Sequence, residues 1–286
     1  SEMCIRDRYG NAMALAEMNK LAGDEAKVRK YTDEASQLKT LVENKLWNGK
    51  HEFFETLKTD TLANVREAIG FIPWYFNMPD NKKYDVAWKQ VTDEKGFSAP
   101  YGLTTCERRS PLFRTHGTGT CEWDGAVWPF ATSQTLTAMA NYINNYPEPI
   151  VGSKEFFHDM EVYVESQYHR GRPYIGEYLD ETNGAWLMGD RERSRYYNHS
   201  TFNDLMITGI CGLRPQADGS IIVNPLVPEG KWDYFCLDNV RYHNHNITVV
   251  YDKTGTRYHQ GKGLSLLVDG KKVVERSDLG RLEYKF

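Results

Sequence analysis

A stretch rich in carboxylates and aromatic rings, RPYIGEYLDETNGAW at residues 172–186, is the first part of this sequence that could do chemistry. Carboxylate pairs perform general acid–base catalysis, and they also occur in ordinary solvated turns. A glycine and Tyr178 flank Glu177, whereas Asp180 and Glu181 lead into a TNG turn. We therefore predict that Glu177 carries the chemistry and that Asp180 and Glu181 are turn residues.

A second stretch, GTGTCEWDGAVWPFATSQTL at residues 117–136, combines two tryptophans with an aspartate. Trp123 and Trp128 bracket Asp124, and Pro129 is typical of the first turn of a helix. One interpretation is a packed loop before a helix, with Trp128 in the core. The other makes Trp123 a stacking platform for a sugar ring and Asp124 a hydrogen-bond partner of sugar hydroxyls.

Further aromatic and polar residues complete the predicted carbohydrate site. Aromatic faces pack against the apolar faces of pyranose rings, and side-chain amides and imidazoles bind the hydroxyls. The residues that we expect to bind the substrate are Trp123, Trp128, Gln134, Tyr174, Tyr178, Trp186 and His199.

A metal site is the alternative suggested by the histidines. His243 and His245 lie two residues apart in a predicted strand, which places both on one face, but no third ligand is evident. The five cysteines form no C-x-x-C pair. We therefore predict neither a metal nor a cofactor.

The bulk composition limits the partners. The chain has 286 residues, 40% of them hydrophobic, which is enough for one large domain with a small companion. Its net charge of -4, without a dense block of lysine and arginine, argues against nucleic-acid binding. No apolar run approaches the roughly 18 residues of a membrane-spanning helix. A carbohydrate is the partner that we expect.

Helices must position these two stretches. Apolar residues at helical spacing predict a helical hairpin over residues 9–47, with Asp24 capping its second helix. Further helices are predicted over residues 81–91, 132–146, 153–168 and 200–211. Long loops join them, which indicates a toroid or bundle with a loop-built site. After Leu213, short apolar runs separated by turn residues such as Asp-Gly predict a small β domain.

Four segments resemble, in this order, the C-terminal half of (α/α)6-toroid six-hairpin glycosidases of glycoside hydrolase family 63 and the mannosylglycerate-hydrolase-like kind. They are YGNAMALAEM, CEWDGAVWPFATSQTL, YIGEYLDETNG and YYNHSTFNDLMITGICGLRP. The end of the chain is similar to the β domain of bacterial α-L-rhamnosidases. The resemblance implies a mainly α fold, with a partial toroid over residues 9–212 and a β-sandwich-like domain over 213–286.

The first eight residues, SEMCIRDR, resemble translated adapter sequence. We expect them to be a non-native leader, and we expect the chain to be a C-terminal fragment of a bacterial protein. The absence of a signal peptide then says nothing about secretion, and a periplasmic or secreted location is our expectation for the full-length protein.

The resemblance also implies an inverting, exo-acting hydrolysis of α-glycosidic bonds, in which one carboxylic acid protonates the leaving oxygen and a carboxylate activates water. The general base of the family falls on Glu177, with Tyr178 beside it and Gly184 at a slightly longer spacing. The general acid of the family lies well over a hundred residues earlier, so we expect it before residue 1 and the chain alone to be inactive. Asp124, where relatives carry arginine, is the alternative acid.

Two other functions stay open at this point. A non-catalytic carbohydrate-binding protein would share the same toroid. A polysaccharide lyase would use an Asn/His site, for which Asn198 and His199 are available. The sequence does not identify the sugar of the substrate: an α-glucoside, an α-mannoside and an α-L-rhamnoside are all candidates.

Overall fold

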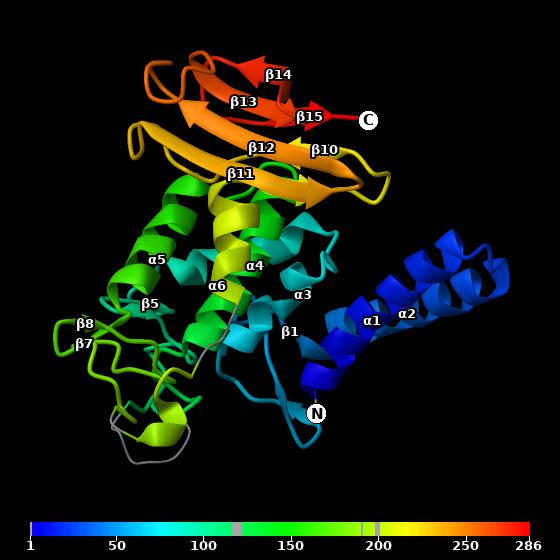
Figure 1. Ribbon diagram of the computed structural model, residues 1–286. Coiled ribbons are helices and arrows are strands. Elements are labelled where there is room, and N and C mark those ends of the chain that lie inside the picture. Colours follow the sequence, from blue (N-terminus) through cyan, green and yellow to red (C-terminus); the bar gives the residue numbers. More distant parts are fainter. Residues whose placement is uncertain (1, 116–121, 190, 198–200) are drawn as a thin grey trace. The chain divides into compact units, whose positions relative to one another are not determined.

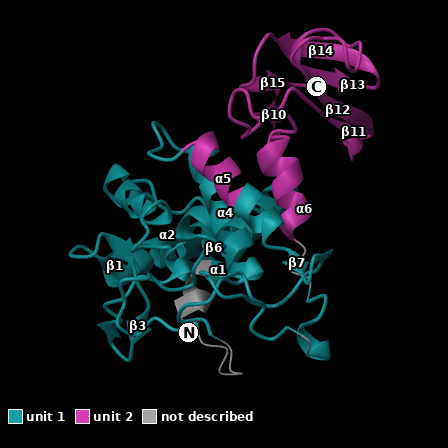
Figure 2. Ribbon diagram, turned by 90° about the vertical axis from the view of Figure 1, so that its left-hand side faces the viewer, with its two compact units in different colours: residues 1–151, 161–199 teal, residues 152–160, 200–286 magenta. Residues whose placement is uncertain are grey.

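The computed structural model describes residues 2–115, 122–189, 191–197 and 201–286 (Figure 1). The chain divides into two compact units (Figure 2). Unit 1 comprises residues 1–151 and 161–199, and unit 2 comprises residues 152–160 and 200–286. The fold is mainly helical, a partial toroid followed by a small C-terminal β domain, as the sequence predicted.

The predicted helical hairpin opens unit 1. It consists of α1 (Glu2–Leu21) and α2 (Glu25–Leu46), and α1 runs through the segment that we expected to be a leader. The Asp24 side chain caps α2 by accepting a hydrogen bond of 3.1 Å from the backbone N–H of Lys27. One face of α2 is buried at helical spacing, through Ala35, Leu38, Val42 and Leu46.

Short elements fill the segments between the longer helices of unit 1. The described part of unit 1 has four two-stranded hairpins: β1 (Trp47–Asn48) with β2 (Phe53–Phe54), β3 (Leu57–Lys58) with β4 (Thr61–Leu62), β5 (Ser98–Ala99) with β6 (Gly102–Leu103), and β7 (Tyr168–His169) with β8 (Arg172–Pro173). The short helical turns are η1 (Ala68–Phe71), α3 (Ile72–Tyr75), η2 (Lys82–Val91) and η3 (Glu192–Ser194). The helix predicted over residues 81–91 is therefore the 3-10 helix η2, a distinction that apolar spacing alone does not make.

An aromatic core holds the helices of unit 1 together. Helix α4 (Pro129–Asn145) begins at the predicted proline and carries Tyr142, which stacks on Trp88 with ring centroids 5.2 Å apart. Phe71 stacks on the same tryptophan at 4.7 Å. All three rings are buried, so their apolar area anchors the segments that enter and leave the site loops. Helix α5 (Ser153–Glu165) is shared between the two units.

Unit 2 contains the β domain. Helix α6 (Thr201–Leu205) continues into the π-helical turn η4 (Met206–Ile210). The strands are β9 (Leu213–Pro215), β10 (Ile221–Val223), β11 (Tyr234–Tyr242), β12 (His245–Asp252), β13 (Gly263–Val268), β14 (Lys271–Arg276) and β15 (Leu282–Tyr284). They form antiparallel sheets of order β15-β10-β9 and β11-β12-β13-β14. Among the described residues, no helix is long and apolar enough to cross a membrane.

Two-residue turns join the long strands of unit 2. His243-Asn244 connects β11 to β12 and Asp269-Gly270 connects β13 to β14, with positive φ at both positions of each, as type I′ turns require. The Asp-Gly turn confirms the prediction. The placement of His243 in a strand beside His245 was wrong, because His243 lies in the turn. In the described part of the chain, no three His, Cys, Asp or Glu side chains are grouped as a metal site.

A glycine in the tryptophan-rich loop generates a prediction. A Cβ atom on Gly125 would lie 1.9 Å from the carbonyl oxygen of Arg114, whereas a Cβ on Gly49 would meet nothing within 4 Å. We expect Gly125→Ala to lower the free energy of unfolding by about 2–3 kcal/mol, because backbone must move, and Gly49→Ala to be nearly neutral. Urea unfolding followed by tryptophan fluorescence compares the two. Equal stability of both variants would contradict the tight approach.

Candidate functional site

Backbone bridges bring the two predicted stretches together. Val127 and Leu179 exchange two N–H to carbonyl hydrogen bonds, each of 3.0 Å, in an antiparallel bridge. Leu179 forms a further bridge with Trp186, and Val127 forms one with Thr104. The carboxylate-rich stretch, which follows α5, therefore lies side by side with the tryptophan-rich stretch, which directly precedes α4.

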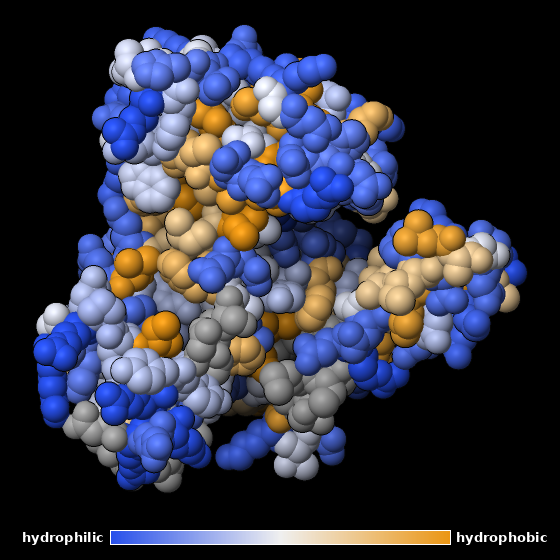
Figure 3. All heavy atoms as spheres, in the orientation of Figure 1, coloured by the Kyte–Doolittle hydropathy of each residue, from blue (hydrophilic) through white to orange (hydrophobic). Residues whose placement is uncertain are grey.

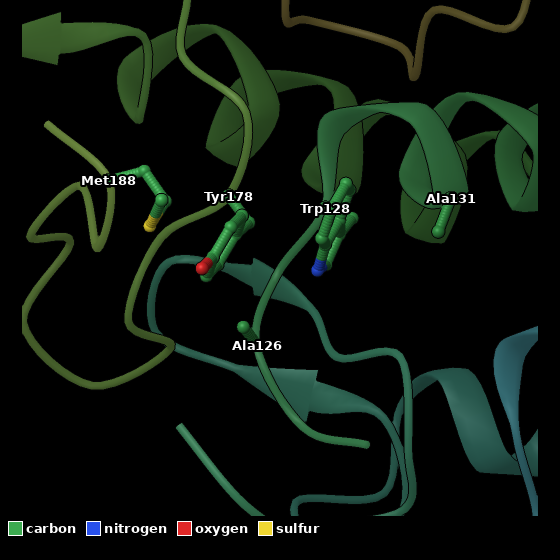
Figure 4. Packing of buried hydrophobic residues seen from close by; sticks show 5 residues of the cluster. All are labelled: Ala126, Trp128, Ala131, Tyr178 and Met188. Atoms are coloured by element: carbon green, nitrogen blue, oxygen red, sulfur yellow. The ribbon is translucent and has the colours of Figure 1, made fainter. Parts of the chain in front are cut away.

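Three aromatic rings form a continuous stack across these stretches. The centroids of Trp123 and Trp128 lie 4.3 Å apart at 25°, and those of Trp128 and Tyr178 lie 4.7 Å apart at 7°. Figure 4 shows the two inner rings face to face, with Met188 beyond Tyr178. Trp128 and Tyr178 are buried, and the outer ring of Trp123 is 42% exposed. The interpretation that puts Trp128 in the core is confirmed, and Trp123 presents the stack to solvent.

Tyr174 and Trp186 form a second buried cluster beside the stack. The Tyr174 hydroxyl donates to the carbonyl of Gly189, and the indole N–H of Trp186 donates to the carbonyl of Tyr168 at 2.8 Å. Their polar atoms are thus occupied within the loop. A Cβ atom on Gly176 would lie 2.2 Å from the Trp186 ring, which explains the small residue before Glu177. In this structure the two rings support the loop from inside.

Glu177 is a buried carboxylate, 3% exposed, that is held from two sides. Arg193 Nη2 lies 3.1 Å from its Oε1 and 3.4 Å from its Oε2, and the Ser194 hydroxyl donates to Oε2. Both partners belong to η3, and Arg193 supplies the counter-charge that a buried carboxylate requires. Sequence reasoning missed this pair. Its signal was the basic segment RERSR at residues 191–195, but no spacing rule selects one arginine of the three.

The other two carboxylates of the stretch have different surroundings. Asp180 accepts hydrogen bonds from the backbone N–H groups of Thr182 and Asn183 at 2.8 and 3.1 Å, which confirms that it is a turn residue. Partial burial acts to raise the pKa of Asp180, but these hydrogen bonds outweigh it and lower the pKa below its usual value. Glu181 also lies in the turn, as predicted. It is buried, however, and its Oε2 has no hydrogen-bond partner among the described residues.

Asp124 forms a separate ion pair. Arg114 donates to Asp124 Oδ1 from Nη2 at 3.1 Å and from Nε at 3.3 Å, and both side chains are partly exposed. The role of Asp124 as the alternative general acid stays a prediction.

Two predicted binding residues are not joined to this cluster. Gln134 is half-buried on α4, and its side chain forms no hydrogen bond with the described residues. His199, like its neighbours Asn198 and Ser200, lies outside the part of the chain that the structure describes. Their roles stay predictions.

Solved structures of other proteins resemble this chain to different degrees. A protein named sialidase is 64% identical, with a TM-score of 0.96; the match covers 99% of this chain and 26% of that one, so the chain spans about a quarter of the relative. A glycoside hydrolase family 63 mannosylglycerate hydrolase from Thermus thermophilus is 18% identical, with coverages of 55% and 36% and a TM-score of 0.42. An uncharacterized conserved protein from the same organism is 16% identical, with coverages of 62% and 43% and a TM-score of 0.45.

Family models divide the chain near the start of the β domain. The model of the glycosyl hydrolase family 65 C-terminal domain matches residues 213–274, which hold strands β9 to β13 and most of β14. The model of the mannosylglycerate hydrolase MGH1-like glycoside hydrolase domain matches residues 8–200, which include the aromatic stack and Glu177. The chain therefore belongs to the mannosylglycerate hydrolase MGH1-like glycoside hydrolase family.

Proposed function

We propose that the protein containing this chain is an inverting, exo-acting hydrolase of α-glycosidic bonds in oligo- or polysaccharides, with Glu177 as the general base. The observation that carries the proposal is the arrangement of Glu177. Its carboxylate is withdrawn from solvent and fixed in orientation by Arg193 and Ser194, next to a stack of aromatic rings. A base that activates one water molecule needs such a fixed lone pair.

The contacts of Glu177 suggest which oxygen takes the proton. Among the described residues, Oε2 receives the hydroxyl of Ser194 and the longer contact to Arg193, while Oε1 receives only the shorter contact to Arg193. A carboxylate oxygen has two acceptor sites, so Oε1 keeps one for a water molecule. In the proposed step Oε1 removes a proton as the water oxygen attacks the anomeric carbon, while a second carboxylic acid protonates the departing oxygen.

The second carboxylic acid is expected in residues that precede this chain. Asp124 is the weaker candidate, because its carboxylate is already engaged in an ion pair with Arg114. On this account the chain alone does not hydrolyse glycosides. Hydrolysis by the 286-residue chain would place the acid inside it, and Asp124→Asn would then be the first variant to test.

The aromatic residues have two proposed roles: one ring contacts the sugar, and the others hold that ring and the neighbouring loop in place. Trp123 offers an exposed indole face on which a pyranose ring can pack. Trp128 and Tyr178 back that indole, and Tyr174 and Trp186 stabilise the neighbouring loop. Because Trp128, Tyr178, Tyr174 and Trp186 are buried, we propose that they mainly support the site and make little direct contact with the sugar. Gln134 and His199 remain proposed hydroxyl-binding residues.

Sialidase activity is a second candidate, favoured by the name of the 64% identical relative. Sialidases use a tyrosine nucleophile in place of a carboxylate pair. The chain corresponds to only 26% of that relative, so the named activity can reside in another part of it. The lyase and the non-catalytic binding protein are left without a specific supporting observation.

The role of Glu177 is tested by Glu177→Gln in a longer protein that contains this chain and the residues before it. We expect kcat/KM on nitrophenyl α-glycosides to fall about 1,000-fold, because the amide cannot accept the proton of water. Glu181→Gln is the matched control, since Glu181 is buried in the same loop, and we expect less than about a threefold change. A panel of α-glucoside, α-mannoside, α-L-rhamnoside and sialoside separates the candidate activities. Unchanged hydrolysis in Glu177→Gln would remove Glu177 from the base role.

The platform role of Trp123 predicts a change in binding. We expect Trp123→Ala to raise KM about tenfold with a smaller effect on kcat, because a stacking face outside the reacting bond is lost. Tyr234→Ala is the control, an aromatic residue of similar exposure (47% against 42%) in the β domain. Equal KM values for the two variants would show that Trp123 does not contact substrate.

A further inference from the structure

A pocket of about 590 Å³ opens beside the loop that carries Glu177. Its walls are the β7–β8 hairpin, Tyr174 and the two residues that follow η3. This volume is in the range of pockets that hold small-molecule ligands. Figure 3 shows hydrophilic side chains over the corner of the molecule where Figure 1 labels β7 and β8.

The charge of the pocket has one sign. Arg170, Arg172 and Arg195 line it, and the described lining residues include no aspartate or glutamate. Arg172 and Arg195 form no ion pair with the described residues, and the Arg195 guanidinium lies over the Tyr196 ring, 5.2 Å from its centroid. Their hydrogen-bond donors can therefore serve an anionic ligand. Several like charges around a concave surface attract an anion. The planar guanidinium fork binds a carboxylate through two parallel hydrogen bonds.

Aromatic rings in the same pocket suit the body of a sugar. Tyr196 is 63% exposed, and its ring lies 6.1 Å from the ring of Tyr174 between centroids. His169 adds a third ring, 5.2 Å from Tyr174. Such faces pack against the apolar side of a pyranose. Guanidinium groups beside aromatic faces therefore match a ligand that has both a carboxylate and a pyranose ring.

The pocket is tied to Glu177 through the backbone. Helix η3 supplies the two residues that hold Glu177, Arg193 and Ser194, and Arg195 follows directly as its C-terminal cap. On the other wall, Tyr174 precedes Glu177 by three residues. A ligand in the pocket is thus bound by the same two segments that fix the carboxylate.

We propose that this pocket is a subsite for an acidic sugar residue, one that bears a carboxylate, of the saccharide that the enzyme binds. The proposal rests on the proposed glycosidase function and names the substrate class of the same site. Arg172 and Arg195 hold the carboxylate, and Tyr196 packs against the ring. Neutral saccharides leave the guanidinium groups without an anion and bind less well.

Calorimetric titration of the 286-residue chain tests the subsite without requiring turnover. The probes are a glucuronate-ended disaccharide and its glucose-ended counterpart, and sialyllactose with lactose as its neutral counterpart. We expect at least one acidic probe to bind about tenfold or more tightly than its neutral counterpart. The two pairs tell a uronic acid from a sialic acid. Equal binding within both pairs, or no binding of any acidic probe, would overturn the proposal.

Variants locate the effect. We expect Arg172→Gln and Arg195→Gln each to weaken binding of the preferred acidic probe about tenfold and to leave the neutral probe unchanged. Arg29→Gln is the control, an exposed arginine on α2 that removes the same charge elsewhere. Circular dichroism checks that all variants are folded. Unaltered acidic binding in both pocket variants, or an equal loss in Arg29→Gln, would contradict the assignment.

The outcome is separable from that of the catalytic proposal. Glu177→Gln keeps the arginines in place, so we expect it to retain the preference for the acidic probe. If that preference is present and Glu177→Gln hydrolyses normally in the longer protein, the catalytic role fails and the subsite stands. If hydrolysis depends on Glu177 and acidic probes show no preference, the subsite fails and the catalytic role stands.

Discussion

A carboxylate that leaves water loses several kcal/mol of hydration unless a counter-charge and hydrogen bonds replace it. Glu177 meets this constraint with Arg193 and Ser194, sixteen and seventeen residues further along the chain. The long loop between them must therefore fold back onto itself. Its inner surface is filled by Tyr174 and Trp186, whose polar atoms bond to backbone within the loop. The buried charge and the aromatic filling depend on each other.

The tryptophan-rich stretch is attached to this loop by backbone and by rings. The Val127–Leu179 bridge sets the register, and the Trp128 ring lies between Trp123 and Tyr178. Because Tyr178 directly follows Glu177, the stack and the carboxylate clamp share one segment. Small residues permit the close approach, since a side chain on Gly125 would collide with backbone. The site is thus an assembly of two loops, one directly before α4 and one after α5.

Local rules predicted much of the fold. The cap at Asp24, the proline start of α4 and the Asp269-Gly270 turn follow from chemistry within a few residues, and all three are present. His243 was misplaced because a strand pattern does not show where a two-residue turn interrupts it.

The site was predictable only in part. The sequence offered both the core position of Trp128 and the exposed position of Trp123, but burial decided between the alternatives. The Arg193 and Ser194 clamp escaped prediction because it depends on how a loop closes, and the basic segment holds three arginines. The arginine pocket escaped prediction for the same reason, since it is lined by residues of the 169–174 segment and by residues of the 189–196 segment, which only the closure of the loop brings together.

The central claim is that Glu177, held in place by Arg193 and Ser194, removes a proton from water and does not attack the sugar itself. Proton NMR of the reaction of the longer protein with an α-glycoside tests it most directly, because the anomer that appears first reports the geometry of attack. The account predicts that the β-anomer appears first and the α-anomer follows by mutarotation. First appearance of the α-anomer would show retention of configuration and would contradict the claim.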